Sequence, residues 1–212
     1  MKISEIKLLS ERKLKNPTFI MGLFDQYAIS DIVIQTLINH TKSEKFAELY
    51  SPNFPDYVIS EENGILHLPR YDFYASEQFD PNIILMTGDM RPGIEDAQAH
   101  YEIFDVVFNF VKDQGCKRYI SFGTFPKESA EDTMYVAATK GSLVSLITKK
   151  LGGKPFSGGS IDGLIGLILG FANLQKFPAI CILGPTSEYA YQQEIAQKMF
   201  HYIIEILKLK VE

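Results

Sequence analysis

The sequence has few of the residues from which metal sites and disulfide scaffolds are built. Its 212 residues include only two cysteines and four histidines. Cys116 and Cys181 lie far apart in strand-like surroundings, so we expect both to be buried and reduced. The histidines stand apart from one another and from the cysteines, without the short spacings typical of metal ligands. We therefore predict no metal site and no cofactor.

An excess of positive charge and a long apolar run are also missing. Lysine and arginine number 21 against 26 acidic residues, which gives a net charge of −5. A nucleic-acid-binding protein normally carries a basic face, so we predict no nucleic-acid partner. The longest apolar run, residues 161–172, is shorter than the roughly 20 residues of a membrane-spanning helix. The first residues lack the basic-then-apolar pattern of a signal peptide, and we expect a cytoplasmic protein with no membrane partner.

The composition is that of a globular protein. Apolar residues make up 46% of a chain that is long enough to bury a substantial core. No internal repeat, low-complexity tract or internal linker divides the sequence. We predict a single α/β domain over residues 1–212, with residues 1–16 as a candidate edge strand and linker.

Apolar segments closed by glycine-containing turns predict the strands. Residues 18–24, 83–87, 118–123 and 179–183 are apolar runs, as expected of strands covered on both faces. Helix-like patterns separate them, and this alternation is typical of parallel βαβ units. Asn63-Gly64 lies between two further apolar segments and is a strong hairpin signal. We expect a mostly parallel central sheet with an added antiparallel hairpin. The aromatic residues that follow the hairpin predict either core packing or a subunit contact: Tyr71, Phe73, Tyr74 and Phe79.

The glycine-rich stretch at residues 152–186 predicts a loop, a helix and a buried strand. Ser160 is the expected helix cap, since orphan amide donors at a helix start favour a side-chain oxygen. Apolar residues surround the whole circumference of the helix at 161–174, so we expect it to be buried. Its three glycines at 163, 166 and 170 share one face and predict the close approach of a neighbouring element.

Two enzymatic patterns in this stretch are incomplete. Residues 153–160 match a phosphate-binding loop except that Gly159 stands in place of the lysine, and Pro155 removes an amide donor. Residues 158–162 resemble a nucleophile elbow, but Asp162 replaces its last glycine. We interpret the loop as structural, predict no catalytic residue, and expect no hydrolysis of nucleoside triphosphates. A Ser/His/Asp triad assembled from distant segments stays open at this point.

A ligand crevice is expected where the strands end, because ligands of open α/β sheets bind outside the carboxyl ends of the strands. Asp25, Asp89 and Arg91 are the charged residues there. They either bind a polar ligand or form an ordinary exposed turn pair. The candidates for this crevice are Asp25, Gly88, Asp89, Arg91, Gly123, Thr124, Gly158, Gly159, Ser160, Gly184 and Thr186.

Taken in order, several short motifs resemble the archaeal proteasome assembly chaperone family, relatives of the second subunit of the eukaryotic proteasome-assembling heterodimer. The resemblance covers roughly residues 21–189. It is carried by Ser51-Pro52, Phe54-Pro55, Gly64, Leu68-Pro69-Arg70, Phe73-Tyr74, Thr87-Gly88-Asp89, Gly158-Gly159, Gly163, Gly166, Pro178-Ala179 and Gly184-Pro185-Thr186.

This resemblance implies a three-layer α/β fold similar to the nucleoside-phosphorylase type. It also implies self-association, which we expect to give a trimer or larger ring, and binding to proteasome α subunits or the assembled particle. One departure is Val211, which stands where members that dock on the proteasome have a tyrosine in the C-terminal tail. The working hypothesis is a non-catalytic scaffold of the proteasome-assembly-chaperone type. The alternative is a phosphorylase- or hydrolase-like enzyme with a small-molecule site at the strand carboxyl ends.

Overall fold

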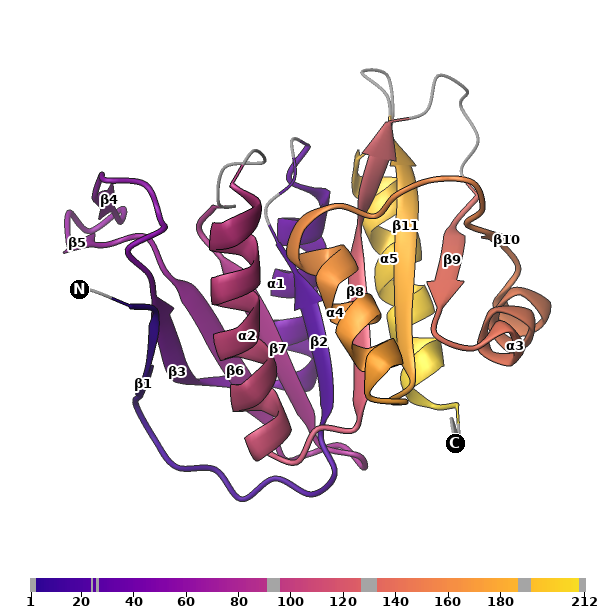
Figure 1. Ribbon diagram of the computed structural model, residues 1–212, viewed down its shortest axis with the longest axis horizontal. Helices are drawn as coiled ribbons and strands as arrows, with labels where there is room; N and C mark the ends of the chain where they lie inside the picture. Colours follow the sequence, from indigo (N-terminus) through magenta and orange to yellow (C-terminus); the bar gives the residue numbers. More distant parts are fainter. Residues whose placement is uncertain are drawn as a thin grey trace.

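A large sheet runs through the whole molecule. The computed structural model describes residues 3–23, 25, 27–90, 96–126, 133–186 and 192–209. The strands of the sheet are β1 (Glu5–Leu8), β2 (Thr18–Gly22), β3 (Glu44–Tyr50), β6 (Tyr71–Ser76), β7 (Ile83–Gly88), β8 (Arg118–Pro126), β9 (Tyr135–Ala138), β10 (Lys154–Pro155) and β11 (Ala179–Thr186). They lie in the order β1-β3-β6-β7-β2-β8-β11-β9-β10, so β1 and β10 form the two edges (Figure 1).

The centre of the sheet is parallel, as the sequence predicts. Strand β2 pairs with β7 on one side and with β8 on the other, and β8 pairs with β11, all in parallel. Every residue of β2 and β11 is buried, because helices cover both faces of these strands. The predicted buried strands at the centre of the sheet are therefore confirmed, with different ends. Strand β2 ends at Gly22 rather than at residue 24, which lies outside the described residues, whereas β8 and β11 continue three residues beyond their expected ends, to Pro126 and Thr186.

Antiparallel strands flank this parallel centre. On one side β6 lies between β3 and β7, and on the other β9 pairs with β11. The aromatic segment after the hairpin thus includes a strand of the main sheet, in which Tyr71 and Phe73 are fully buried. The predicted hairpin is confirmed. Its strands, β4 (Ile59–Ser60) and β5 (Leu66–His67), form a separate two-stranded sheet that projects beyond the β1 side of the molecule (Figure 1).

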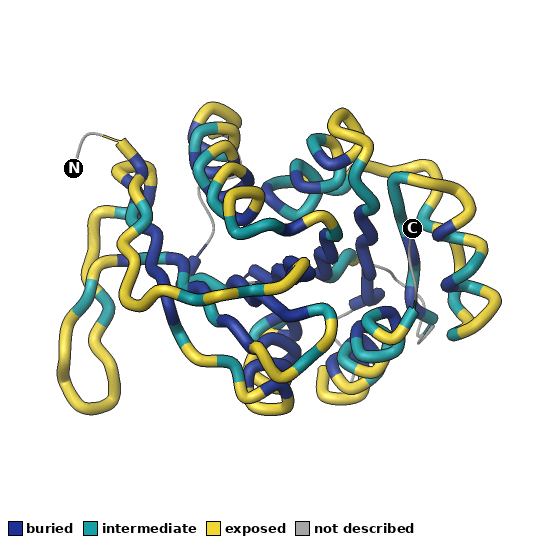
Figure 2. Tube along the Cα trace, turned by 90° about the horizontal axis from the view of Figure 1, so that it is seen from below, coloured by how far each residue is buried: buried dark blue, intermediate teal, exposed yellow. Residues whose placement is uncertain are grey.

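Helices form a layer on each face of the sheet. The helices are α1 (Ile29–Thr41), α2 (Ala97–Asp113), α3 (Gly141–Leu151), α4 (Gly163–Leu174) and α5 (Gln192–Leu207). Helices α2 and α4 lie in front of the sheet in Figure 1, α1 and α5 lie behind it, and α3 stands at the β10 edge. Figure 2 shows dark buried segments concentrated between the two helical layers. The predicted three-layer arrangement is confirmed.

Successive side chains of the central strands point alternately into two separate hydrophobic cores, one on each face of the sheet. Along β2, Phe19 and Met21 pack beneath α2 and α4, whereas Ile20 packs beneath α1 and α5. This alternation follows from the two-residue period of a strand. Because both faces need apolar residues, the central strands appear in the sequence as continuous apolar runs.

The prediction that α4 is buried on all sides is wrong. Only Leu164, Ile168 and Ala172 of this helix are buried, and Leu174 is 78% exposed. The helix lies in an outer layer, where one face meets the sheet and the opposite face meets solvent. The predicted cap is also wrong, since Asp162 occupies the N-cap position and exposed Ser160 lies two residues before it.

The glycines of α4 give a matched pair of substitutions. A Cβ on Gly166 would lie 1.8 Å from the carbonyl oxygen of Ile161, whereas a Cβ on Gly170 meets nothing within 4 Å. We expect Gly166→Ala to lower the free energy of unfolding by about 1–3 kcal/mol, because the loop before α4 must move. Gly170→Ala should raise it by up to about 1 kcal/mol through helix propensity. Urea unfolding of both variants checks this, and equal effects would contradict the close approach at Gly166.

Candidate functional site

The structure places the described crevice candidates at the end of the molecule where the parallel strands finish. Gly184 pairs with Thr124 in the ladder between β11 and β8, and the Thr186 hydroxyl donates to the Phe125 carbonyl at 3.3 Å. Gly123, Thr124, Gly184 and Thr186 are thus strand residues rather than turn residues. Arg91 lies outside the described residues.

The glycine-rich loop runs from β10 across this end of the molecule to α4 (Figure 1). Phe156, near its start, packs edge-to-face on Phe125 of β8, with ring centroids 5.6 Å apart. Gly158, Gly159 and Ser160 are exposed, and Gly158 has a positive φ of 73°. Backbone strain in the left-handed region explains the glycine at 158 without any ligand.

Asp25 has a structural task at the start of α1. Its carboxylate accepts hydrogen bonds from the backbone amides of Tyr27, Ile29 and Ser30, at 2.9, 3.2 and 2.6 Å. The amides of Ile29 and Ser30 belong to the first turn of the helix, where donors have no partner within the helix, and Tyr27 lies just before the N-cap residue Ala28. Asp25 is 6% exposed, so most of its hydrogen-bonding capacity is already used inside the protein.

Asp31, in the first turn of the same helix, gives a pH-dependent prediction. Burial raises the pKa of Asp31 to about 6, and the nearby charge of Asp25 adds to this effect. The folded state then holds the proton more tightly than the unfolded state, whose carboxyl keeps the ordinary pKa of 3.8. Stability contributed by this group is therefore lost as the pH rises from about 4 to 6, and it stays lost above that range.

We expect Asp31→Asn to raise the free energy of unfolding by about 1–2 kcal/mol at pH 8 and to change it little at pH 4. Partial exposure of the side chain and the favourable position of an acid near a helix start both reduce the gain. Urea unfolding at both pH values is the measurement. Asp105→Asn, at an exposed position of α2, is the control and should change stability by less than about 0.5 kcal/mol at either pH. An equal gain from Asp31→Asn at pH 4 would contradict the argument.

Asp89 joins the end of β7 to the segment that precedes β6. Its carboxylate accepts the Arg70 amide hydrogen bond at 3.0 Å, and its own amide donates to the Arg70 carbonyl at 3.2 Å. The His67 ring nitrogen lies 3.7 Å from the same carboxylate. Burial raises the pKa of Asp89, while the hydrogen bond from Arg70 acts in the opposite direction.

A network of charged side chains on β3 and β6 is absent from the sequence predictions. Glu48 and Asp72 lie directly opposite each other in this antiparallel pair, and two cations separate their carboxylates. The Lys45 ammonium lies 2.9 Å from Glu48 and 3.2 Å from Asp72, and the Arg70 guanidinium lies 3.0 Å from Asp72 and 3.6 Å from Glu48. The Tyr50 hydroxyl donates to Glu48 at 3.0 Å. With both cations shared between the two carboxylates, the network is internally paired.

The described residues contain no group of three or more His, Cys, Asp and Glu side chains that could hold a metal ion. Both cysteines are buried and free, as predicted, and burial raises the pKa of Cys181 to about 12. A thiol with such a pKa is protonated at neutral pH and is a poor nucleophile. Within the same part of the chain, no helix is long and apolar enough to cross a membrane.

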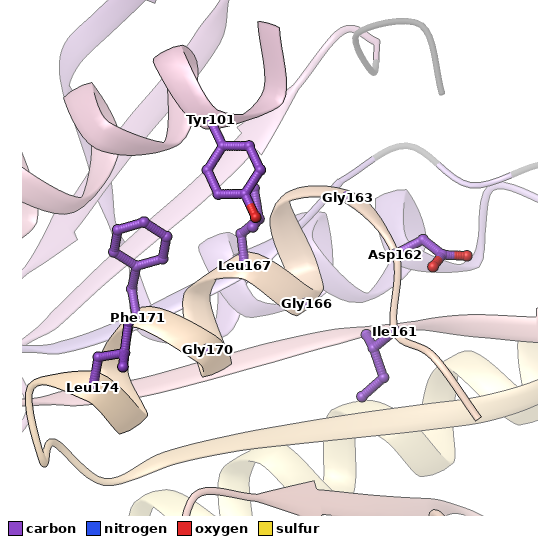
Figure 3. Close-up of a pocket in the computed structure, with 9 residues that line it drawn as sticks. All are labelled: Tyr101, Ile161, Asp162, Gly163, Gly166, Leu167, Gly170, Phe171 and Leu174. Carbon is purple, nitrogen blue, oxygen red and sulfur yellow. The ribbon is translucent and has the colours of Figure 1, made fainter. Parts of the chain in front are cut away.

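An apolar groove lies between α2 and α4. Its volume is about 550 Å³, and its lining includes Tyr101, Phe171 and the open face at Gly170, where a Cβ would meet nothing within 4 Å (Figure 3). The rings of Tyr101 and Phe171 are 6.3 Å apart, and Leu174 closes one end. Asp162 is the one charged residue in the lining, so the groove offers shape and apolar contact rather than catalytic groups. The sequence contained the signal for this groove, the glycine face of α4, but the prediction of a buried helix concealed it.

Comparison with known proteins places the chain in a family. The sequence model of the PAC2 family matches residues 19–212. Among solved structures, the chain is similar to Pyrococcus furiosus PbaB, an archaeal proteasome activator, with 27% identity and a TM-score of 0.89 over 100% of this chain and 92% of that one.

It is also similar to Pyrococcus furiosus PbaA, an archaeal homolog of proteasome-assembly chaperone. That identity is 20% and the TM-score is 0.78, over 100% of this chain and 84% of that one, so this likeness concerns the fold. An uncharacterized protein of Methanocaldococcus jannaschii, MJ1210, is 25% identical over 99% of this chain and 81% of that protein. The match over nearly the entire sequence shows that the chain belongs to the PAC2 family.

Proposed function

We propose that the protein is a non-catalytic, chaperone-like binding protein that acts on proteasome α subunits or on the assembled proteasome. The observation that carries this proposal is the full-length likeness to the proteasome activator PbaB, at 27% identity and a TM-score of 0.89. Membership of the PAC2 family supports the same class of function.

The placement of the polar candidates also favours binding over catalysis. Asp25 caps α1, and Asp89 holds the backbone of Arg70, so both carboxylates serve the fold. The apolar groove beside α4 has a single charged side chain in its lining. An active site needs mutually positioned groups with defined roles, and the described residues show no such set around these positions. We therefore put forward no second function.

Binding to the proteasome is tested with the full chain. Tagged protein is mixed at micromolar concentration with recombinant α subunits of the same organism and, separately, with assembled proteasome, and each mixture is sedimented. We expect the chain to sediment with one of the two. Failure to bind either one would overturn the proposal.

Self-association is the second part of the proposal, and we propose a trimer or larger ring. Light scattering should give a mass that is a multiple of the 24.0 kDa chain. A mass of one chain at micromolar concentration would contradict self-association. It would leave the proteasome-binding experiment as a separate test.

A further inference from the structure

Two elements at opposite ends of the sheet carry opposite charge. Strands β1 and β10 are the edges of the sheet, so they lie at opposite ends of the molecule. The β4–β5 hairpin projects at the β1 end, and α3 stands at the β10 end (Figure 1). Both features lie outside the two helical layers that cover the central strands, so each is available to another molecule.

The segment that contains the β4–β5 hairpin is acidic and apolar. Residues 51–69 contain Asp56, Glu61 and Glu62 but no lysine or arginine. Asp56 and Glu62 are exposed. The hairpin also exposes five large apolar side chains, each between 48% and 61% exposed: Tyr57, Val58, Ile65, Leu66 and Leu68. A projecting element with this many exposed apolar side chains is typical of an interaction surface.

The segment that contains α3, at the other end of the sheet, is basic. Residues 133–161 contain four lysines and no aspartate or glutamate. Lys149 and Lys150 are exposed in the last turn of α3. Partly exposed apolar side chains accompany them on α3 and on the segment after β10: Val144, Leu146 and Phe156. The end therefore offers positive charge beside apolar contact, which complements the hairpin.

We propose that the hairpin of one copy docks on the α3 end of a second copy, so that the copies associate head to tail and close into a ring. This inference rests on the proposed self-association and names the surfaces that produce it. A contact between two different surfaces of one chain is heterologous, and it closes into a ring when the rotation per subunit allows. Side chains make this contact rather than strand pairing, because β10 is only two residues long and Pro155 lacks an amide donor.

Charge also argues against two other surfaces as the docking site of the hairpin, a second hairpin and the groove between α2 and α4. A symmetric contact between two hairpins would bring the carboxylates of Asp56 and Glu62 together, and like charges at an interface oppose association. The groove between α2 and α4 is apolar, but Asp162 lies in its lining and exposed Asp105 is one helical turn from Tyr101. An acidic hairpin would be repelled there as well. Lys149 and Lys150 of α3 would instead attract it.

Charge reversal tests the pairing. The first variant carries Asp56→Lys and Glu62→Lys, and the second carries Lys149→Glu and Lys150→Glu. We expect each variant alone to associate at least about tenfold more weakly than the parent chain, with the mass measured by light scattering. A chain with all four substitutions should regain the oligomer. An equal mixture of the two variants restores opposite charges only between unlike copies, so it should assemble with an even number of copies. Rising salt concentration should weaken the parent oligomer.

The control reverses two exposed acids on α2, Asp105→Lys and Asp113→Lys, and should leave the mass unchanged. Melting curves of every variant establish that each is folded. If the parent chain is oligomeric and either end variant keeps the full mass, the assignment of these surfaces is overturned while self-association stands. If the parent chain is a monomer, self-association and the assignment of these surfaces are both wrong. If the second variant alone keeps the oligomer, the contact is between hairpins and the head-to-tail arrangement is wrong.

Discussion

Phe108→Ala is expected to lower the free energy of unfolding by about 3–5 kcal/mol. Phe108 of α2 is 2% exposed and lies between the helical layer and the sheet. Its ring stacks on Tyr119 of β8 with centroids 5.4 Å apart, and it also contacts Phe104 at 5.5 Å and Phe171 at 6.1 Å. Truncation removes the contacts that join α2, α4 and the central strand β8, and leaves a cavity that three other rings cannot fill without moving.

The matched control is Tyr101→Ala, which truncates another aromatic residue of α2. Tyr101 is 54% exposed and lies at the groove, 6.3 Å from the ring of Phe171. Because little of its surface is buried, we expect a loss below about 1.5 kcal/mol. Urea unfolding gives both values. Losses of equal size would show that the core beneath α2 and α4 is not packed as described.

The central strands were predictable because their burial requires a continuous run of apolar residues, which is visible in the local sequence. Parallel strands that are covered on both faces need apolar residues at every position, so residues 83–87 and 179–183 stand out without knowledge of their neighbours. Strand β6 shows a weaker apolar pattern. Tyr71 and Phe73 face the core, but Asp72 between them joins the charged network of β3 and β6. Its pairing with β3 and β7 joins segments far apart in the chain, which a local pattern does not reveal.

Helix α4 shows the limit of reading burial from composition. Apolar residues around its whole circumference indicate that some element covers each face, but they do not say which element. Within one chain the sheet covers the face of Leu164 and Ile168, while the face of Leu174 stays exposed. The inference of close approach was right at Gly166, where the neighbour is the helix's own preceding loop. It was wrong at Gly163 and Gly170, where a Cβ would meet nothing within 4 Å.

The role of Asp25 depends on geometry a few residues away. From the sequence it is an acid after a strand and therefore a ligand candidate. In the structure the chain turns at Ala28, with φ of 55°, and brings the amides of Ile29 and Ser30 onto the carboxylate. The charged network of Lys45, Glu48, Arg70 and Asp72 leaves even less local signal, because it depends on the register of two antiparallel strands.

Arg70→Met is expected to lower the free energy of unfolding by about 2–4 kcal/mol at pH 7. The side chains of Arg70, Glu48 and Asp72 are only 13%, 9% and 16% exposed. Removal of the guanidinium leaves two opposed carboxylates with Lys45 as their remaining cation. The loss of one partner from a largely buried network costs more than the loss of a surface pair, because the charge left behind is poorly solvated.

The effect of Arg70→Met should depend on pH. Burial alone would raise the pKa of Glu48, but hydrogen bonds from Lys45 and Tyr50 and the charges of Lys45 and Arg70 outweigh it, so the pKa lies below the ordinary 4.5. The stability that this carboxylate contributes is therefore present above about pH 4.5 and is lost as the pH falls through its lower folded pKa. The variant lacks the Arg70 charge, so its ionised Glu48 carboxylate contributes less stability that a fall in pH can remove. The difference between the two proteins should accordingly shrink as the pH falls from 7 to 3.

Arg12→Met is the control for this prediction. Arg12 pairs with Glu44 at 2.7 Å, but the Glu44 side chain is 72% exposed, so its loss should cost less than about 1 kcal/mol. Arg70→Lys keeps the positive charge without the forked guanidinium, and should recover part of the loss. Urea unfolding at pH 7 and pH 3 gives all three comparisons. A loss from Arg70→Met that stays the same at both pH values would mean that packing of its side chain, rather than its charge, stabilises the junction between β3 and β6.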